Sequence, residues 1–322
     1  MATARDRNRW PKSSRRMGVG VILPMAEMEN GGTGSGRFAD LLSLTRTAEE
    51  IGLDAIWLPD HFLFRAPVVP EGTEYGAWEA FTTAAALAQA TSRIQIGLLV
   101  TCLGWRNPGI VARMTETIDE ISGGRFILGA GAGWHQPEYD AYGMPFDHRA
   151  SRFEEALVIL NDLLKTGRST RSGTYFETVD AISQPRGPRM EQGGPPILVG
   201  SVGERVMRLT AQFADGWNSA WHKTADDAEK NVAAMRAACE AVGRDPETMI
   251  MTAGGEIAPD GTFAEGLDPL RGTDEEMAAE LGRFRELGFR HYVAAMDPVT
   301  PDVIRKLGEV VKLLDASEGN NA

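Results

Sequence analysis

The pair Asp60-His61 is the clearest sign of chemistry in this sequence. It directly follows the apolar run 55–59, and such a run is typical of a buried strand. A carboxylate and an imidazole at the end of a strand can exchange protons with a bound molecule, because histidine changes charge near neutral pH. In a parallel α/β barrel these strand ends form the open mouth where catalytic groups lie. We therefore interpret Asp60 and His61 as candidate catalytic residues.

Imidazoles and large flat side chains gather after the other predicted strand ends. They are His61, His135, His148, His222, Trp105, Trp134 and Trp221. Taken singly, each of them is better explained as an aromatic cap on a barrel. Together they favour a surface that binds a planar aromatic cofactor. The fifth histidine, His291, begins a predicted strand at the opposite end and is interpreted as structural.

Two glycine-rich segments also follow strand ends. In 129–133, alternating glycine and alanine leave room for a ring or a phosphate, although tight packing of strand and helix would require the same residues. The segment Gly200-Ser201-Val202-Gly203 opens a predicted helix that carries Arg205. Its free backbone N–H groups, hydroxyl and helix dipole suit an anion. We expect a phosphate site there, with a plain capping turn as the alternative.

Motifs of several other enzyme classes are missing from the sequence. No His-x-His, His-Glu-x-x-His or carboxylate cluster stands at the predicted strand ends, so no metal site is expected. There is no Gly-x-Ser-x-Gly, which argues against serine hydrolysis. No lysine falls inside a predicted strand, which argues against Schiff-base chemistry.

Apolar runs alternate strictly with helical periodicity from Gly18 onward. Strands are predicted at 18–24, 55–59, 94–100, 125–131, 196–200, 215–219, 249–257 and 290–296. Helices are predicted at 37–51, 78–91, 107–121, 148–165, 203–213, 224–242, 273–287 and 300–315. Alternation predicts a parallel sheet, and eight repeats predict a closed (β/α)8 TIM barrel rather than an open doubly wound sheet. An insertion at 167–195, with a hairpin at 173–176, precedes the fifth strand.

Composition limits the possible partners and compartments. A net charge of −12 makes nucleic acid an improbable partner. Two distant cysteines favour a reducing cytoplasm over a disulfide scaffold. No apolar run reaches the roughly 18 to 20 residues that cross a bilayer. We therefore expect a cytoplasmic protein without a membrane segment.

The first 17 residues differ from the rest of the chain. They hold six basic side chains and one acid, a net charge of +5, and no apolar core of a signal peptide. We interpret 1–17 as a disordered basic extension, or as a start placed too early because Met17 directly precedes the first strand. A basic binding arm is the less favoured alternative. Residues 18–322 are expected to form one barrel domain.

Several segments together resemble the bacterial luciferase-like oxidoreductases, which include flavin-dependent monooxygenases and enzymes that use the deazaflavin coenzyme F420. The matching segments are 58–62, 96–101 with Asn107-Pro108, 122–134, Glu138-Tyr139 with Tyr142-Gly143, 152–155 and 195–201. The resemblance covers the barrel from Gly18 to about Leu314. Its most specific part runs from the third predicted strand through the fourth.

The resemblance implies roles for named residues. His61 would lie beside the reactive edge of the cofactor ring as an acid/base or anion stabiliser, with Asp60 orienting the loop or the imidazole. The third strand would end in a bulge behind the ring, formed by a non-prolyl cis peptide at Leu98-Leu99. Leu98, Leu99 and Thr101 would bind the cofactor. The pocket would be lined by Ala132, Gly133 and Trp134, with Trp134 beside the chemistry. The phosphate would be held by Gly200, Ser201 and Gly203.

The resemblance also implies the reaction. We expect hydride transfer between F420 and a small organic substrate, because Asp-His after the second strand resembles the F420-using members. Gly133-Trp134-His135 departs from the glutamate that follows glycine in F420-dependent sugar-phosphate dehydrogenases, and the tryptophans favour an apolar or aromatic substrate. The alternatives are a reduced-FMN-dependent monooxygenase served by a separate flavin reductase, and a barrel that binds a flavin or ligand without turnover. A homodimer is expected.

Overall fold

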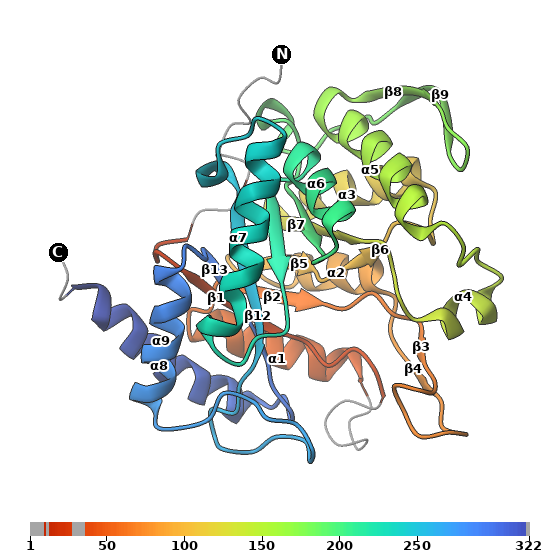
Figure 1. Cartoon of the computed structure of the whole chain (residues 1–322). Helices are drawn as coiled ribbons and strands as arrows, with labels where there is room; N and C mark the ends of the chain where they lie inside the picture. The colour runs from red at the N-terminus through yellow and green to blue at the C-terminus, as the bar shows by residue number, and fades with distance from the viewer. Residues whose placement is uncertain (1–9, 11–12, 28–35, 320–322) are drawn as a thin grey trace.

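Eight parallel strands form a closed barrel with helices around it (Figure 1). The computed structural model describes residue 10 and residues 13–27 and 36–319. The barrel strands are β1 (Gly18–Ile22), β2 (Ala55–Leu58), β5 (Gln95–Leu98), β7 (Phe126–Gly131), β10 (Ile197–Gly200), β11 (Gly216–Ser219), β12 (Ile250–Glu256) and β13 (His291–Ala295). Each strand pairs with the next in this order, including β7 with β10, and β13 pairs with β1 to close the barrel. The predicted TIM barrel is confirmed.

Each of the eight predicted helices is present between or after the barrel strands. They are α1 (Phe38–Glu50), α2 (Ala80–Gln89), α3 (Pro108–Ser122), α5 (Arg149–Thr166), α6 (Glu204–Phe213), α7 (Ala225–Ala241), α8 (Asp274–Glu286) and α9 (Pro301–Gly319). Local sequence sets several of their ends. Capping boxes begin α7 at Thr224 and α8 at Thr273. Left-handed glycines end α3 at Gly123 and α5 at Gly167.

Side chains alternate between the barrel interior and the layer beneath the helices. Val19 and Val21 of β1 join the large core under the helices, whereas Ile22 faces the interior cluster around Trp57. Within the interior, Trp57 Nε1 donates a hydrogen bond to His291 Nε2 at 3.0 Å. Burial lowers the pKa of His291 to about 4. His291 is therefore a neutral hydrogen-bonded residue inside the barrel, in line with its structural interpretation.

Part of the predicted basic extension packs against the barrel. Residues 1–9 and 11–12 lie outside the described residues. Ser13 and Arg15 both bond to the carboxylate of Asp54, just before β2, and Arg15 also pairs with Asp315 of α9. Trp10 packs against the interior cluster. The described residues of this segment therefore lie at the end of the barrel where the strands begin.

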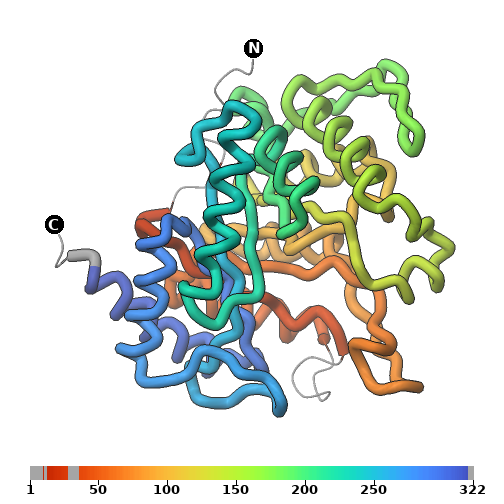
Figure 2. The backbone as a smooth tube through the Cα atoms, viewed as in Figure 1, coloured from red at the N-terminus to blue at the C-terminus, as the bar shows by residue number. Residues whose placement is uncertain are grey.

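Insertions interrupt the repeating pattern at three places. A hairpin of β8 (Arg168–Ser172) and β9 (Glu177–Ile182) packs on α5, and residues 173–176, where the hairpin was predicted, form the turn between the two strands. A second small hairpin, β3 (Leu63–Phe64) and β4 (Tyr75–Gly76), follows β2, and the two hairpins lie at different ends of the molecule (Figure 2). After β7 comes a short helix, α4 (Gln136–Tyr142), which is not among the predicted helices. The short strand β6 (Thr101–Cys102) pairs with β7.

Two 3₁₀ turns complete the described elements. They are η2 (Met190–Gln192) and η3 (Pro246–Thr248). In the described part of the chain, no helix combines the length and the apolar character that a membrane crossing needs.

Candidate active site

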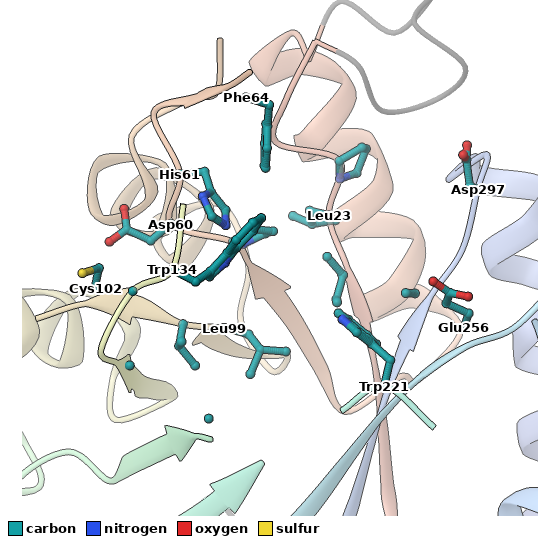
Figure 3. Close-up of a pocket in the computed structure, with 18 of the residues that line it drawn as sticks. Leu23, Asp60, His61, Phe64, Leu99, Cys102, Trp134, Trp221, Glu256 and Asp297 are labelled. Carbon is teal, nitrogen blue, oxygen red and sulfur yellow. The ribbon is translucent and has the colours of Figure 1, made fainter. Parts of the chain in front are cut away.

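A cavity of about 590 Å³ lies at the carboxyl ends of the barrel strands (Figure 3). Residues at or just after the end of every barrel strand contribute to its lining, from Ile22 after β1 to Asp297 after β13. The volume is within the range of pockets that bind small organic ligands. All three tryptophans that follow predicted strand ends, Trp105, Trp134 and Trp221, line it. The predicted mouth of the barrel is therefore one continuous site.

His61 is held in the cavity wall by a buried carboxylate. Its Nδ1 lies 2.9 Å from Oε2 of Glu138, whose side chain is 0% exposed. The other carboxylate oxygen accepts hydrogen bonds from the backbone N–H groups of Phe62 and Leu63 at 2.6 and 3.3 Å. An ionised carboxylate only accepts hydrogen bonds, so it fixes Nδ1 as a donor and leaves Nε2 for a ligand.

The ring of His61 is surrounded by aromatic side chains. The centroid distances are 4.7 Å to Phe64, 5.7 Å to Trp134 and 6.3 Å to Trp105. Both tryptophan rings meet the imidazole nearly edge to face. These contacts and the bond to Glu138 give the imidazole a defined orientation.

Asp60 is committed to an ion pair instead of facing a ligand freely. It is 1% exposed, and its carboxylate accepts hydrogen bonds from Arg106 at 2.6 and 3.0 Å and from Thr101 Oγ1 at 2.5 Å. Arg106 also bonds to Glu79 at the start of α2. This network ties the end of β2 to the segment after β5. Asp60 therefore supports the backbone that carries His61, and Thr101 supports Asp60.

The non-prolyl cis peptide predicted at Leu98-Leu99 lies one bond later, at Leu99-Val100. The prediction was wrong by one residue because Leu98 is still part of the buried strand β5, and Leu99 N–H still bonds to the carbonyl of Leu58 at 2.9 Å. Leu99 and Val100 line the cavity, whereas Leu98 is not among the lining residues. A second cis peptide, Ala220-Trp221, was not predicted.

The glycines of β7 make room for this bulge. A Cβ on Gly129 would lie 1.7 Å from the carbonyl oxygen of Leu98, and one on Gly131 would lie 2.6 Å from Val100. Real contacts of this kind are essentially never shorter than 3.0 Å. Of the two interpretations left open for this segment, close packing explains Gly129, whereas Gly131 also lines the cavity.

Ala132, Gly133 and Trp134 all line the cavity. Gly133 has a φ of +77°, and a Cβ there would lie 2.0 Å from the hydroxyl oxygen of Tyr139. That hydroxyl donates to the Ala132 carbonyl at 3.2 Å and contacts the thiol of Cys102. Burial raises the pKa of Tyr139, and it raises that of Cys102 to about 11, so both groups stay protonated at neutral pH. Trp134 is 55% exposed above this turn.

The predicted phosphate segment lies at the cavity edge. Gly200 and Ser201 line the cavity, and Gly203 is the N-cap of α6 outside it. Ser201 Oγ accepts a hydrogen bond from the Gly203 N–H at 3.1 Å, which is the capping turn considered as the alternative. Arg205 bonds to Glu154 and to Ser151. A Cβ on Gly203 would meet only Ser201 Oγ, at 3.7 Å, so the turn is open on its outer side.

The other rim histidines do not line the cavity. His135 is buried and its Nε2 accepts from the Arg65 N–H at 3.3 Å, while His222 bonds to Ser219 at 2.7 Å. Burial lowers the pKa of both. His148 contacts Tyr175. Among the described residues, no group of three or more potential ligands could hold a metal ion.

Arg106, Glu256 and Asp297 were not singled out from the sequence, and Glu138 was named only as part of the family resemblance, without a role. Arg106 acts through Asp60, and Glu138 acts through His61. Each of the two lies far from its partner in the sequence. Glu256 and Asp297 line the cavity from β12 and from the segment after β13. A signal for the last two was available, because Glu256 is the one acid within the predicted strand 249–257 and Asp297 directly follows the predicted strand 290–296.

The fold and the cavity define a (β/α)8-barrel protein with a ligand site at the carboxyl ends of its strands. Residues 17–271 match the family model described as luciferase-like monooxygenase. The chain therefore belongs to the luciferase-like monooxygenase family, which contains both F420-dependent and flavin-dependent oxidoreductases.

Curated relatives of two kinds are similar in sequence. Pyrimidine monooxygenase RutA of Cronobacter sakazakii is 37% identical over 54% of this chain and 52% of the relative. RutA of Methylobacterium radiotolerans is 36% identical over 62% of this chain and 53% of the relative. An F420-dependent glucose-6-phosphate dehydrogenase of Amycolatopsis mediterranei is 32% identical over 55% and 52%. The alignments thus span about half the length of these relatives.

Solved structures share the fold at low sequence identity. An F420-dependent secondary alcohol dehydrogenase has a TM-score of 0.75 at 20% identity, covering 93% of this chain and 99% of its own. A riboflavin lyase has a TM-score of 0.78 at 15% identity, covering 96% and 93%. At these identities the likeness establishes the barrel and says nothing further about the reaction.

Proposed function

We propose that this protein transfers a hydride between coenzyme F420 and a small organic substrate, with His61 as the acid/base or anion stabiliser. The observation that carries the proposal is the His61–Glu138 pair in the wall of the cavity. Oxidation of an alcohol or reduction of a carbonyl moves a proton at the substrate oxygen together with the hydride. An imidazole held by a buried carboxylate is suited to that proton transfer.

The described residues fit a flavin-like cofactor. Leu99 and Val100 offer an apolar back to a planar ring, and Ala132, Gly133 and Trp134 flank the same space. The turn from Gly200 to Gly203 offers a phosphate backbone N–H groups and the Ser201 hydroxyl, with open space beside Gly203. When bound, F420 supplies the hydride chemistry at its central ring. The protein contributes orientation, exclusion of water and the proton.

His61 performs the proton step in this proposal. Its Nδ1–H donates to Glu138, so its Nε2 carries or accepts the proton. Glu138 stabilises the imidazolium that forms when Nε2 takes a proton. Asp60 and Arg106 fix the backbone beside His61 and are positioning residues. Trp134 contacts the substrate or the ring from the outer side.

The second candidate is a reduced-FMN-dependent monooxygenase that works with a separate flavin reductase. The similarity to pyrimidine monooxygenases favours it. In both candidates the substrate is a small molecule, and the tryptophans of the cavity favour an apolar or aromatic one. The homodimer and the cytoplasmic location stay predictions, and light scattering after gel filtration tests the first of them.

Turnover assays separate the candidates. Wild-type protein is incubated without oxygen with reduced F420 and a panel of carbonyl compounds, and with oxidised F420 and the matching alcohols. His61→Ala is expected to lower turnover by about 10²- to 10⁴-fold. Its affinity for F420 should change less than about twofold, which would show that the site is intact. His148→Asn is the control, because this exposed histidine lies outside the cavity lining and asparagine tolerates its φ of 51°.

Three results would change the assignment. Equal turnover in wild type and His61→Ala would remove His61 from the mechanism. Substrate-dependent oxygen uptake with FMN and a reductase would establish the monooxygenase instead. Tight cofactor binding without turnover across the panel would favour a barrel that binds its ligand without catalysis.

A further inference from the structure

Two carboxylates line the cavity on the side away from His61. Glu256 is the last residue of β12, and Asp297 follows β13 by two residues. These strands are neighbours, with Glu256 in register with Ala295. Figure 3 shows Glu256 and Asp297 on one side of the cavity and Asp60 and His61 on the other.

Neither carboxylate has a described protein partner. No described residue forms a hydrogen bond or ion pair with the side chain of Glu256 or Asp297, whereas Asp60 is fully bonded to Arg106 and Thr101. No lysine or arginine belongs to the described lining of the cavity. Burial without a compensating cation raises the pKa of both Glu256 and Asp297. A half-buried carboxylate with no donor is an unfavourable arrangement that a ligand can relieve.

The surroundings of the two acids are apolar. Phe263, Leu267, Met296 and Val299 come from the segments that follow β12 and β13 and line the same cavity. Trp221 lies on the side of Glu256 in Figure 3. An apolar or aromatic body can pack against these side chains, and an ammonium can also rest on a tryptophan face. An anionic substrate would meet two like charges and no opposite charge.

We propose that Glu256 and Asp297 select a substrate that carries a protonated amine on an apolar or aromatic body. The ammonium group binds on the side of the cavity that carries the two carboxylates, and the rest of the substrate extends toward His61. The inference deepens the proposed function, because it names the substrate class of the same site. It also assigns Glu256 and Asp297 as specificity-determining residues.

The test measures binding without any cofactor, so it does not depend on the proposed reaction. Three probes share one skeleton and differ in charge: 2-phenylethylamine, 2-phenylethanol and 3-phenylpropionate. Their dissociation constants are measured by ligand-observed NMR at pH 7.5 and low salt. The amine is expected to bind about tenfold more tightly than the alcohol, and the carboxylate most weakly.

The variant E256Q/D297N keeps the shape of both side chains and removes their charges. It is expected to bring the amine and the alcohol to within about twofold of each other. The control E229Q/E275Q removes two charges at exposed positions of α7 and α8, and should keep the preference. Circular dichroism melts verify that each variant is folded.

Equal binding of the three probes by wild type, or an amine preference that survives in E256Q/D297N, would overturn the proposal. Failure of the proposed function is distinguishable from this, because it would show as absent F420 and FMN binding with the amine preference intact. If E256Q/D297N does not fold, the single variants E256Q and D297N replace it. The proposal would then be overturned if the amine preference were unchanged in both single variants.

Discussion

Replacing Glu138 with glutamine perturbs the His61 pair with the least change of shape. The carboxylate accepts from His61 Nδ1 at 2.9 Å and from the Phe62 N–H at 2.6 Å. In Glu138→Gln the amide oxygen can keep the bond to the Phe62 N–H, which turns the amide NH₂ toward His61. An amide NH₂ only donates, so Nδ1 must become an acceptor and the proton must move to Nε2. The variant therefore presents Nε2 to a ligand as a proton donor instead of as an acceptor.

The expected magnitudes differ for stability and for catalysis. Hydrogen bonds to a charged group contribute about 1.5–3 kcal/mol, and the glutamine keeps one of them. We expect a loss near 2 kcal/mol in the free energy of unfolding, or about 3 °C in Tm for a chain of this size. Loss of a positioned general base lowers turnover by about 10²- to 10⁴-fold. Activity should thus fall far more than stability.

Nitrogen NMR of ¹⁵N-histidine-labelled protein reads the tautomer directly and needs no substrate. Wild type should show His61 protonated on Nδ1, and Glu138→Gln should show it protonated on Nε2. Asp140→Asn is the control, because it removes an exposed acid from the same helix, α4. If wild-type His61 is protonated on Nε2 at neutral pH, or if Glu138→Gln leaves the tautomer unchanged, the role given to Glu138 is wrong.

Three further perturbations follow from the contacts. Arg106→Ala leaves the buried Asp60 carboxylate without its ion pair and should cost about 3–5 kcal/mol of stability, measured by urea unfolding. Arg106→Lys should cost less. Equal losses in the two variants would refute the bidentate pair. Gly129→Ala places a methyl against the Leu98 carbonyl and should destabilise the fold by more than about 3 kcal/mol. In Gly200→Ala the new Cβ would lie 3.2 Å from Val100, so the loss of stability should be smaller. Similar thermal melts for the two variants would contradict this. His291 has its pKa lowered to about 4, so the folded state binds fewer protons than the unfolded chain between pH 6.5 and 4. Stability should fall as pH falls through that window, by roughly 3 kcal/mol at most, and His291→Gln should flatten the dependence; an unchanged pH profile in denaturant titrations would refute it.

The elements of the barrel were predictable because their signals are local. Most strands are short, largely apolar runs buried on both faces, and the helices show an apolar face, with caps such as Thr224 and Thr273 at some of their ends. Strict alternation then leaves few topologies open. The helix α4 was missed because it has only seven residues, inside a loop that the strand-and-helix pattern treats as one connection.

The site was predictable in outline and not in its partnerships. His61 follows a strand, so its place on the rim could be inferred. Its partner Glu138 lies 77 residues away, and Arg106 lies 46 residues from Asp60. Such pairs depend on how the loops fold over the mouth, which local sequence does not encode. The cis peptide fell one residue from its predicted place because the end of β5 is set by pairing with β2 and β7, not by its own residues.

The position of the glycines shows the same limit. The sequence alone could not separate a cofactor cradle from close packing in 129–133. The carbonyl of Leu98, in another strand, decides the case for Gly129.

The most direct test of the central proposal is a fluorescence titration of the purified protein with oxidised F420 and, separately, with FMN. We predict micromolar binding of F420 and much weaker binding of FMN. F420 affinity should be lost when a larger side chain replaces Gly200, and it should be kept in His61→Ala. The opposite preference would make the protein a flavin monooxygenase candidate. Binding of neither would contradict both proposed functions for this cavity.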